Sequence, residues 1–292
     1  MKNTNKKFDI YQEITNRIID QLDKGIIPWH KPWSGISSGA YNIVSKRTYS
    51  IMNQMLLKHD GAYATYNQWA NLGGKIRAGE KSEIVVFWKI LPVEEKDDDG
   101  TVTKKTIPLL KYINVFHISQ VDGVEAKEKK IIYHEPIKEA EETISNYNER
   151  ETITMEDVIG DKAYYSPIRD YLCVPTKEQY KDINEYYSTK FHEMIHSTGH
   201  KSRLNRFNEN VVIAPFGSED YSKEELIAEI GSASLMCMLG IETAKTFKNS
   251  TAYIQSWLKV LKDDKRMIVS ASSKAQKAVE YILGISIEDK FA

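Results

Sequence analysis

The sequence predicts an α+β protein built from two domains. Its 292 residues are more than one small hydrophobic core usually organises. Segments of strand-like composition cluster at residues 83–118 and again at residues 152–174, and helical segments precede and follow both clusters. A hydrophobic fraction of 41% with 15 Gly and 8 Pro is typical of a chain that folds around a buried core.

The N-terminal part is expected to open with one amphipathic helix. Apolar residues recur at helical spacing between positions 11 and 22, and Gly25 is a favoured residue just beyond a helix C-terminus. Two shorter helices are expected further along, at residues 50–58 and 67–72.

Strands follow these helices. Residues 83–91, 101–110 and 111–118 are rich in β-branched and aromatic side chains, so we expect each segment to form a strand. An acidic run at residues 94–99 separates the first two segments and is typical of a solvated hairpin tip. Trp88 stands inside the first apolar run, where we expect a core position.

The C-terminal part combines short strands with longer helices. A charged stretch without periodicity at residues 126–136 is expected to link the parts, which gives domains at residues 1–125 and 137–292. The expected helices are residues 137–147, 176–198, 223–239, 250–263 and 274–283, and the expected strands are residues 152–159, 163–165 and 170–174.

Charge and cysteine content exclude several classes of protein. The formal net charge of −1 hides an excess of basic residues in the first 120 positions and of acidic residues afterwards. Cys173 and Cys237 stand far apart, which argues against a disulfide framework and against a thiolate zinc site. No apolar stretch approaches the roughly 18 residues of a membrane span, and the polar start is unlike a secretory signal, so we expect a cytoplasmic protein.

The strongest chemical signal is His192-Glu193-Met194-Ile195-His196 near the end of an expected helix. Two histidines at i and i+4 lie on one helical face and can ligate one cation, and the intervening Glu is placed to act as general base toward water that the cation activates. We expect Zn²⁺, or alternatively Mn²⁺ or another divalent ion. A plainer interpretation is that the two histidines line a core helix beside a surface Glu.

A catalytic zinc site needs a third protein ligand. A third histidine six residues after His196 would be the metzincin arrangement, but that position is Ser202. His200 follows Gly199, where the helix should already have ended, so we expect His200 at the surface or at the rim of a cleft.

A downstream carboxylate is the better candidate. Glu225 and Glu229 stand four residues apart on the next expected helix, and we predict Glu225 as the third ligand and Glu229 as the partner that orients a ligand histidine through its other ring nitrogen. The alternative is that Glu225 closes a capping box with Ser222 at the start of that helix.

Three segments of the C-terminal part resemble one known family. They are YYSTKFHEMIHSTGH at residues 186–200, RLNR at residues 203–206 and EELIAEIGSAS at residues 224–234, and they are similar to the zincin-type metallopeptidase domain of ArdC antirestriction proteins. The resemblance implies a gluzincin-type fold in which His192, His196 and Glu225 are the ligands and Glu193 is the general base. It also implies that residues 170–175 form an edge strand along the cleft, on which an extended polypeptide could pair.

The N-terminal part resembles the single-stranded DNA-binding domain of the same family. The matching segments occur in the family's order, although the family often has Asn after the Val-Phe pair where this chain has His117. They are PWHKPW at residues 28–33, Asn42, residues 49–57, residues 66–69, GGKIRAGEK at residues 73–81, Val115-Phe116 and Gln120.

The residue types of this part point to the same ligand. Aromatic rings stack on unpaired bases and Lys and Arg neutralise phosphates, so the two types interleaved suit a groove for a single strand. A plainer interpretation is that Trp88 is a core residue and that Trp29 and Trp33 only pin a proline-containing loop. The predicted DNA-binding residues are Trp29, Lys31, Trp33, Lys46, Arg47, Trp69, Lys75, Arg77 and Lys81.

These observations predict a single-stranded DNA-binding antirestriction protein of a mobile element with a zinc-dependent metallopeptidase domain. Its partners would be single-stranded DNA and an unidentified polypeptide, without a membrane. Tyr164, Tyr165 and His200 are candidates to stabilise the oxyanion. Two alternatives remain open, namely a protective DNA-binding protein with a structural or vestigial metal site, and a metal-dependent nuclease.

Overall fold

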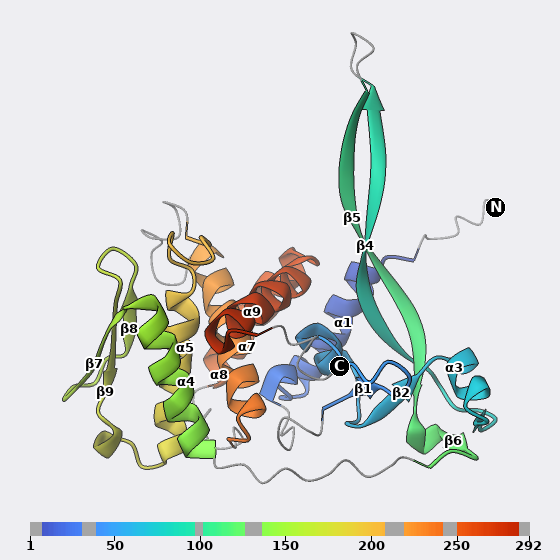
Figure 1. The fold of residues 1–292 in the computed structure, drawn as a ribbon, viewed down its shortest axis with the longest axis horizontal. Coiled ribbons are helices and arrows are strands. Elements are labelled where there is room, and N and C mark those ends of the chain that lie inside the picture. The colour runs from blue at the N-terminus through green and yellow to red at the C-terminus, as the bar shows by residue number, and fades with distance from the viewer. Residues whose placement is uncertain are drawn as a thin grey trace.

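The computed structural model describes residues 8–30, 39–96, 102–125, 136–207, 219–241 and 250–285. Helices and strands alternate along the chain, which confirms the predicted α+β class (Figure 1). Within these ranges, no helix is long and apolar enough to cross a membrane.

Side-chain caps fix the helices of the N-terminal part close to their expected positions. The Asp9 carboxylate accepts hydrogen bonds from the first backbone N–H groups of the first helix, and Gly25 follows its end with φ of 72°. Thr65 forms a capping box with Gln68 at the third helix. The helical elements here are α1 (Ile10–Asp23), η1 (Pro28–His30), α2 (Ile51–Leu56), α3 (Tyr66–Asn71) and η2 (Ile118–Gln120).

The N-terminal part also contains a four-stranded sheet in the order β1-β2-β5-β4 and a two-stranded sheet of β3 and β6. Strands β4 and β5 pair antiparallel along their whole length, so the expected hairpin is confirmed. Its acidic tip from residue 97 lies outside the described residues. The strands are β1 (Tyr41–Asn42), β2 (Ala62–Ala64), β3 (Lys75–Ile76), β4 (Glu83–Lys96), β5 (Val102–His117) and β6 (Val121–Asp122).

Two expectations for this hairpin were wrong. The two expected strands are one continuous strand, β5, because Pro108 sits opposite Ile90 at a position that does not break the pairing. The N–H and C=O of Val86 both bond to the side chain of Asn53, outside the hairpin. Every second residue of β4 from Val86, including Ile90, therefore points its backbone groups away from β5. Pro108, the partner of Ile90 on β5, thus needs no N–H for the pairing. Trp88 is 46% exposed rather than buried, because the hairpin extends away from the body as a two-stranded ribbon (Figure 1).

The C-terminal part contains a three-stranded sheet in the order β7-β9-β8. Strand β9 therefore lies in the centre, which corrects the expectation that residues 170–175 form an edge strand. The elements are α4 (Pro136–Glu151), β7 (Thr154–Val158), β8 (Tyr164–Ser166), β9 (Tyr171–Pro175), η3 (Lys177–Gln179), α5 (Ile183–Ser197), α7 (Glu219–Met238), α8 (Ser250–Asp263) and α9 (Met267–Leu283).

Helices α5 and α9 each begin seven residues away from their expected start, and α7 begins four residues early, at Glu219. Helix α5 begins seven residues later than expected, because Asp182 accepts the N–H of Asn184 as its N-cap and the preceding turn is the separate η3. Helix α9 begins seven residues earlier, where Met267, Ile268 and Val269 are buried. Gly284 ends α9 with φ of 66°, as expected.

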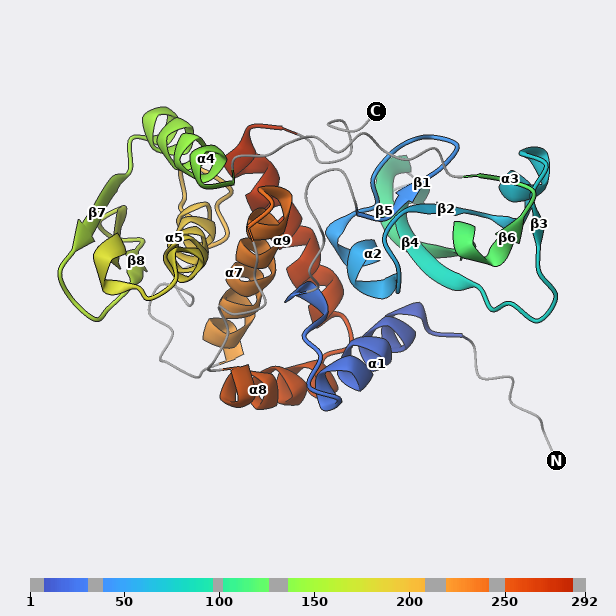
Figure 2. The same cartoon turned by 90° about the horizontal axis from the view of Figure 1, so that it is seen from below.

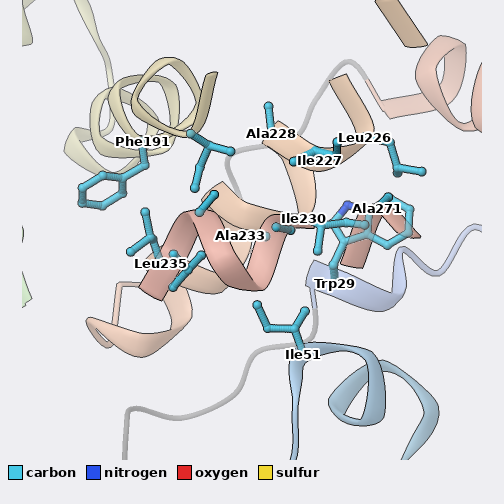
Figure 3. Packing of buried hydrophobic residues seen from close by; sticks show 14 of the residues in the cluster. Trp29, Ile51, Phe191, Leu226, Ile227, Ala228, Ile230, Ala233, Leu235 and Ala271 are labelled. Carbon is cyan, nitrogen blue, oxygen red and sulfur yellow. The ribbon is translucent and has the colours of Figure 1, made fainter. Parts of the chain in front are cut away.

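One hydrophobic core joins the two parts of the chain. Trp29 contacts Trp257 edge to face with ring centroids 5.2 Å apart, and Ile51 of α2 belongs to the same buried cluster as Leu226 of α7 and Ala271 of α9 (Figures 2 and 3). Residues 126–135 of the expected linker lie outside the described residues. The division into domains at residues 1–125 and 137–292 stays a prediction.

Candidate metal centre

The centre forms where α5 and α7 approach closely. Gly231 makes this approach possible, because a Cβ there would lie 2.7 Å from Cδ1 of the buried Ile195. Beside it, the Ser232 hydroxyl donates to the backbone oxygen of Ser188 at 2.8 Å. The small residues of α7 thus hold its acidic N-terminal half against the histidine face of α5.

His192, His196 and Glu225 converge on one point. The two Nε2 atoms are 3.1 Å apart, and each lies 3.4 Å from an oxygen of Glu225. Their side chains are 13–18% exposed. Within the described residues, this is the group of His, Cys, Asp and Glu side chains whose ligand atoms lie close enough to share an ion.

These distances fit a tetrahedral divalent site. Metal–ligand bonds of about 2.0–2.2 Å at tetrahedral angles put neighbouring ligand atoms about 3.3–3.5 Å apart. The three observed separations are 3.1, 3.4 and 3.4 Å. Two imidazoles and one carboxylate are a donor set that Zn²⁺ and Mn²⁺ both accept, and three protein ligands leave a fourth position open.

Two further carboxylates of α7 stand behind the histidines. Glu229 Oε1 lies 3.7 Å from Nδ1 of His192, where we had expected it to orient a ligand ring. Glu224 Oε1 lies 3.4 Å from Nδ1 of His196. Arg206 donates to Glu224 at 2.7 Å and to the backbone oxygen of Ile195 at 2.8 Å, so it ties this carboxylate to α5.

The packed carboxylates and imidazoles shift one another's pKa values. Burial disfavours the charged ring of His196, but hydrogen bonds to Glu224 and Glu225 outweigh it and raise the pKa of His196 well above its usual value. Burial alone would raise the pKa of Glu225, yet its hydrogen bonds to both histidines lower that pKa far below the ordinary range. In the absence of metal, a protonated His196 thus lies beside the ionised Glu225. A bound cation would supply the positive charge that this proton supplies.

Glu193 lies beside the ligands in a nearly closed environment. The residue is 7% exposed, and burial raises the pKa of its carboxyl. The backbone N–H of Tyr165, in the edge strand β8, faces this carboxylate and lowers its pKa slightly against the effect of burial. A carboxylate with a raised pKa is better matched to proton transfer near neutral pH than an ordinary one.

The hydroxyl of Tyr165 is engaged elsewhere, which counts against its expected role at an oxyanion. It donates to Asp170 at 2.7 Å and accepts a hydrogen bond from Arg203 at 3.0 Å. Arg203 binds both oxygens of Asp170 and also donates to the backbone oxygen of Ser197. This buried Arg203 therefore fastens the β8–β9 sheet to the end of α5.

The structure bears on two alternatives, namely a capping role for Glu225 and a ligand role for His200. Helix α7 begins at Glu219, so Ser222 lies inside the helix and cannot form a capping box with Glu225. His200 lies in the turn after α5, where its Nδ1 atom is 2.8 Å from the Ser202 hydroxyl, and it does not belong to the converging group.

The predicted DNA-binding residues are dispersed. Trp29 and Trp69 are 1% and 0% exposed, and Trp69 donates to the backbone oxygen of Phe116 at 2.9 Å. Neither ring has a free face for a base, so the structure contradicts both as stacking residues. Lys31 and Trp33 lie outside the described residues.

The predicted cations of the same part are exposed. Lys46 and Arg47 stand in the turn between β1 and α2, and Lys75 and Lys81 lie near the second sheet. Arg77 forms ion pairs with Glu80 at 2.8 Å and Asp122 at 3.4 Å, which compensate its charge.

Sequence reasoning missed three residues of the centre, namely Glu224, Arg203 and Arg206. Their signal in the sequence was the pair of arginines just after the histidine helix and the doubled Glu at residues 224–225. Sequence alone does not show which side chains these arginines and Glu224 contact, because the contacts form only when α5 packs on α7.

Two families match this chain. Residues 8–116 match the N-terminal domain of anti-restriction factor ArdC, and residues 139–274 match a zincin-like metallopeptidase family.

Several relatives extend the likeness to nearly the whole chain. Two Escherichia coli proteins named DNA primase TraC are each 32% identical over 97% and 95% of this chain, which spans 20% and 27% of their lengths. The protein y4eC of Sinorhizobium fredii (strain NBRC 101917 / NGR234) is 31% identical over 94% of this chain and 91% of its own length.

Two crystal structures of the antirestriction protein ArdC from plasmid R388 have the same fold. The metal-free form gives a TM-score of 0.73 at 33% identity, and the Mn(II)-bound form gives 0.75 at 32% identity. Each comparison covers 98% of this chain and 100% of the other.

Proposed function

Since the chain belongs to the ArdC family of antirestriction proteins and carries a zincin-like metallopeptidase domain, we propose that it binds single-stranded DNA and hydrolyses peptide bonds at its metal centre. The setting would be the cytoplasm, where incoming DNA meets restriction enzymes. The chain spans about a fifth to a quarter of the TraC proteins, so the proposal concerns this part alone.

One arrangement carries the peptidase proposal, namely Glu193 beside three ligand atoms that converge from α5 and α7. A bound divalent ion would supply a Lewis acid that polarises a peptide carbonyl and acidifies water. Zn²⁺ is our first choice and Mn²⁺ the second, since the R388 relative has a Mn(II)-bound form.

The protein's own residues would then complete the reaction. Glu193 takes a proton from the attacking water and later gives it to the leaving amine. Glu224 and Glu229 hold the two histidine rings in position. The backbone of Tyr165 faces the Glu193 carboxylate, so the edge strand β8 runs beside the site, where an extended peptide could pair with it.

Substitution of Glu193 tests the peptidase proposal. Glu193→Gln should retain one metal ion per chain, since Glu193 is not a ligand, but should lose cleavage of a peptide library in which the wild type cuts. Glu142→Gln on α4, an exposed residue far along the chain from the centre, is the matched control and should cut normally. Equal activity of wild type and Glu193→Gln would refute the general base.

A wild type that binds metal but cuts no peptide would favour the alternative of a protective DNA-binding protein with a structural ion. Scission of DNA that a chelator blocks would favour a nuclease.

The DNA-binding proposal is supported by the exposed cations Lys46, Arg47, Lys75 and Lys81 in the part that matches the ArdC N-terminal domain. An electrostatic contact with phosphates releases counterions, so affinity should fall steeply as salt is raised. Affinity for single-stranded and duplex DNA measured against salt concentration tests this. Absent binding, or binding that ignores salt, would refute it.

A further inference from the structure

A groove of about 670 Å³ lies between the N-terminal sheet and helix α9. One wall comes from the turn that follows β1, from α2 and from β4, and the other comes from one face of α9. The volume is in the range of about 300–1,000 Å³ that protein pockets for ligands occupy. The groove thus joins the two parts of the chain at a place away from the metal centre.

Two aromatic rings stand at this groove. Phe87 and Trp88 are 44% and 46% exposed, although their neighbours Val85 and Val86 in β4 are buried. Consecutive strand residues project to opposite faces, so the two rings flank the edge of β4 that borders the groove. Hydrophobic and aromatic side chains are the usual lining of ligand pockets, and these two rings supply such a lining here.

Two cations face each other across the groove. Arg47 belongs to the turn after β1 and Lys277 belongs to α9, and both are exposed. The acidic residue on the lining, Glu280, accepts a hydrogen bond from Gln276 at 3.1 Å. This bond comes from a neutral amide and leaves the negative charge of Glu280 in place, so the two cations and Glu280 give the lining a small positive excess.

Two polar side chains of the lining, Asn53 and Gln276, are hydrogen-bonded to the backbone of neighbouring elements. Asn53 exchanges two hydrogen bonds with the backbone of Val86, at 2.9 and 2.7 Å. Gln276 accepts the N–H of Ile51 at 3.3 Å. These bonds fix α2, β4 and α9 against one another, so the groove keeps its shape. Its ring faces, its cations and the hydroxyl of Tyr49, which has no hydrogen-bond partner among the described residues, are the groups left for recognition.

We propose that this groove binds a single strand of DNA, whose bases stack on Trp88 and Phe87 and whose phosphates pair with Arg47 and Lys277. The proposal rests on the proposed single-stranded DNA binding and gives it a location. Stacking and charge neutralisation are the two interactions by which proteins hold single strands without reading their sequence. A strand in the groove contacts both parts of the chain.

Fluorescence anisotropy of a labelled oligo(dT) strand with the full chain tests the location. Two groove variants, Trp88→Ala and Lys277→Glu, are compared with two controls. Ile90→Ala removes an exposed apolar side chain two residues along the same strand, and Lys274→Glu makes the same charge change one turn earlier on α9, in both cases at residues that do not line the groove.

We expect each groove variant to weaken binding by a factor of about five or more, the value of one stacked base or one neutralised phosphate, while both controls bind as the wild type does. Lys277→Glu should also flatten the salt dependence, whereas Trp88→Ala should leave it unchanged, and Trp88→Phe should restore part of the lost affinity. Groove variants that bind as tightly as the controls, while the wild type binds well, would overturn the location alone. A wild type that does not bind the strand would overturn the proposed function as well.

Discussion

The Nδ1 atom of His196 lies 3.4 Å from Oε1 of Glu224, on the side of the ring turned away from His192 and Glu225. Arg206 holds the same carboxylate and donates to the hydroxyl of Thr198 at 2.6 Å. A carboxylate behind a ligand histidine fixes the ring and makes its other nitrogen a stronger donor to metal.

Replacement of Glu224 should therefore weaken the metal site without removing a ligand. Loss of such a partner usually costs about 10- to 100-fold in metal affinity, and we expect Glu224→Gln to fall in this range. Competition against a chromophoric chelator measures the affinity. The exposed Glu142→Gln serves as control, and a Glu224→Gln protein with the affinity of wild type would contradict the role we give to this contact.

Gly231 should be essential for the approach of α5 and α7. The added Cβ of Gly231→Ala would lie 2.7 Å from Cδ1 of the buried Ile195. Overpacking of this kind costs about 1–3 kcal/mol, of which the better helix propensity of Ala offsets up to about 1 kcal/mol. Urea unfolding of the metal-free protein should show a net loss of stability, and metal affinity should fall because Glu225 lies on the displaced helix.

A double variant separates this clash from a general effect of Ala. Ile195→Val removes the Cδ1 atom that the new Cβ would meet, so Gly231→Ala with Ile195→Val should be more stable than the sum of the two single effects predicts. Strict additivity would show that the two residues do not interact in this way.

His117 should make the stability of the N-terminal part depend on pH. Its Nδ1 accepts the N–H of Ser119 at 3.2 Å, so Nε2 carries the proton and donates to the backbone oxygen of Asp60 at 2.8 Å. Burial lowers the pKa of this imidazole. Below about pH 6.5 the imidazole of the unfolded chain therefore takes up its second proton more readily than that of the folded chain. The free energy of unfolding falls as the pH falls.

The variant His117→Asn should remove this dependence and keep the fold. Asn is a favoured N-cap residue, so it can replace His117 at the start of η2. Denaturant midpoints at about pH 7 and at about pH 5 should drop less for the variant than for the wild type, and the other histidines cancel in this comparison. Equal drops would mean that His117 is not the titrating group.

The parts of the fold that local patterns determine were predictable. Helix α8 has the expected bounds, and Gly25 and Gly284 follow the C-terminal ends of α1 and α9 as expected. The face shared by His192 and His196 also follows from helical spacing alone. Glu225 required a further assumption about which helix lies opposite.

The errors arose where packing between distant segments decides. Apolar composition placed Trp88 in the core, but the structure places it on the lining of the groove between β4 and α9, where it stays 46% exposed. Conversely, Trp29 and Trp69 stand among basic residues in the sequence yet pack inward, against Trp257 and Phe116. Composition cannot tell which face of a ring will be free, because the partners lie elsewhere in the chain.

Anomalous diffraction from a crystal grown with Zn²⁺, and from another grown with Mn²⁺, tests the metal centre most directly. The account predicts one peak about 2.0–2.2 Å from Nε2 of His192, Nε2 of His196 and a carboxylate oxygen of Glu225. A peak at other residues, or no peak at these three side chains in either crystal, would contradict it.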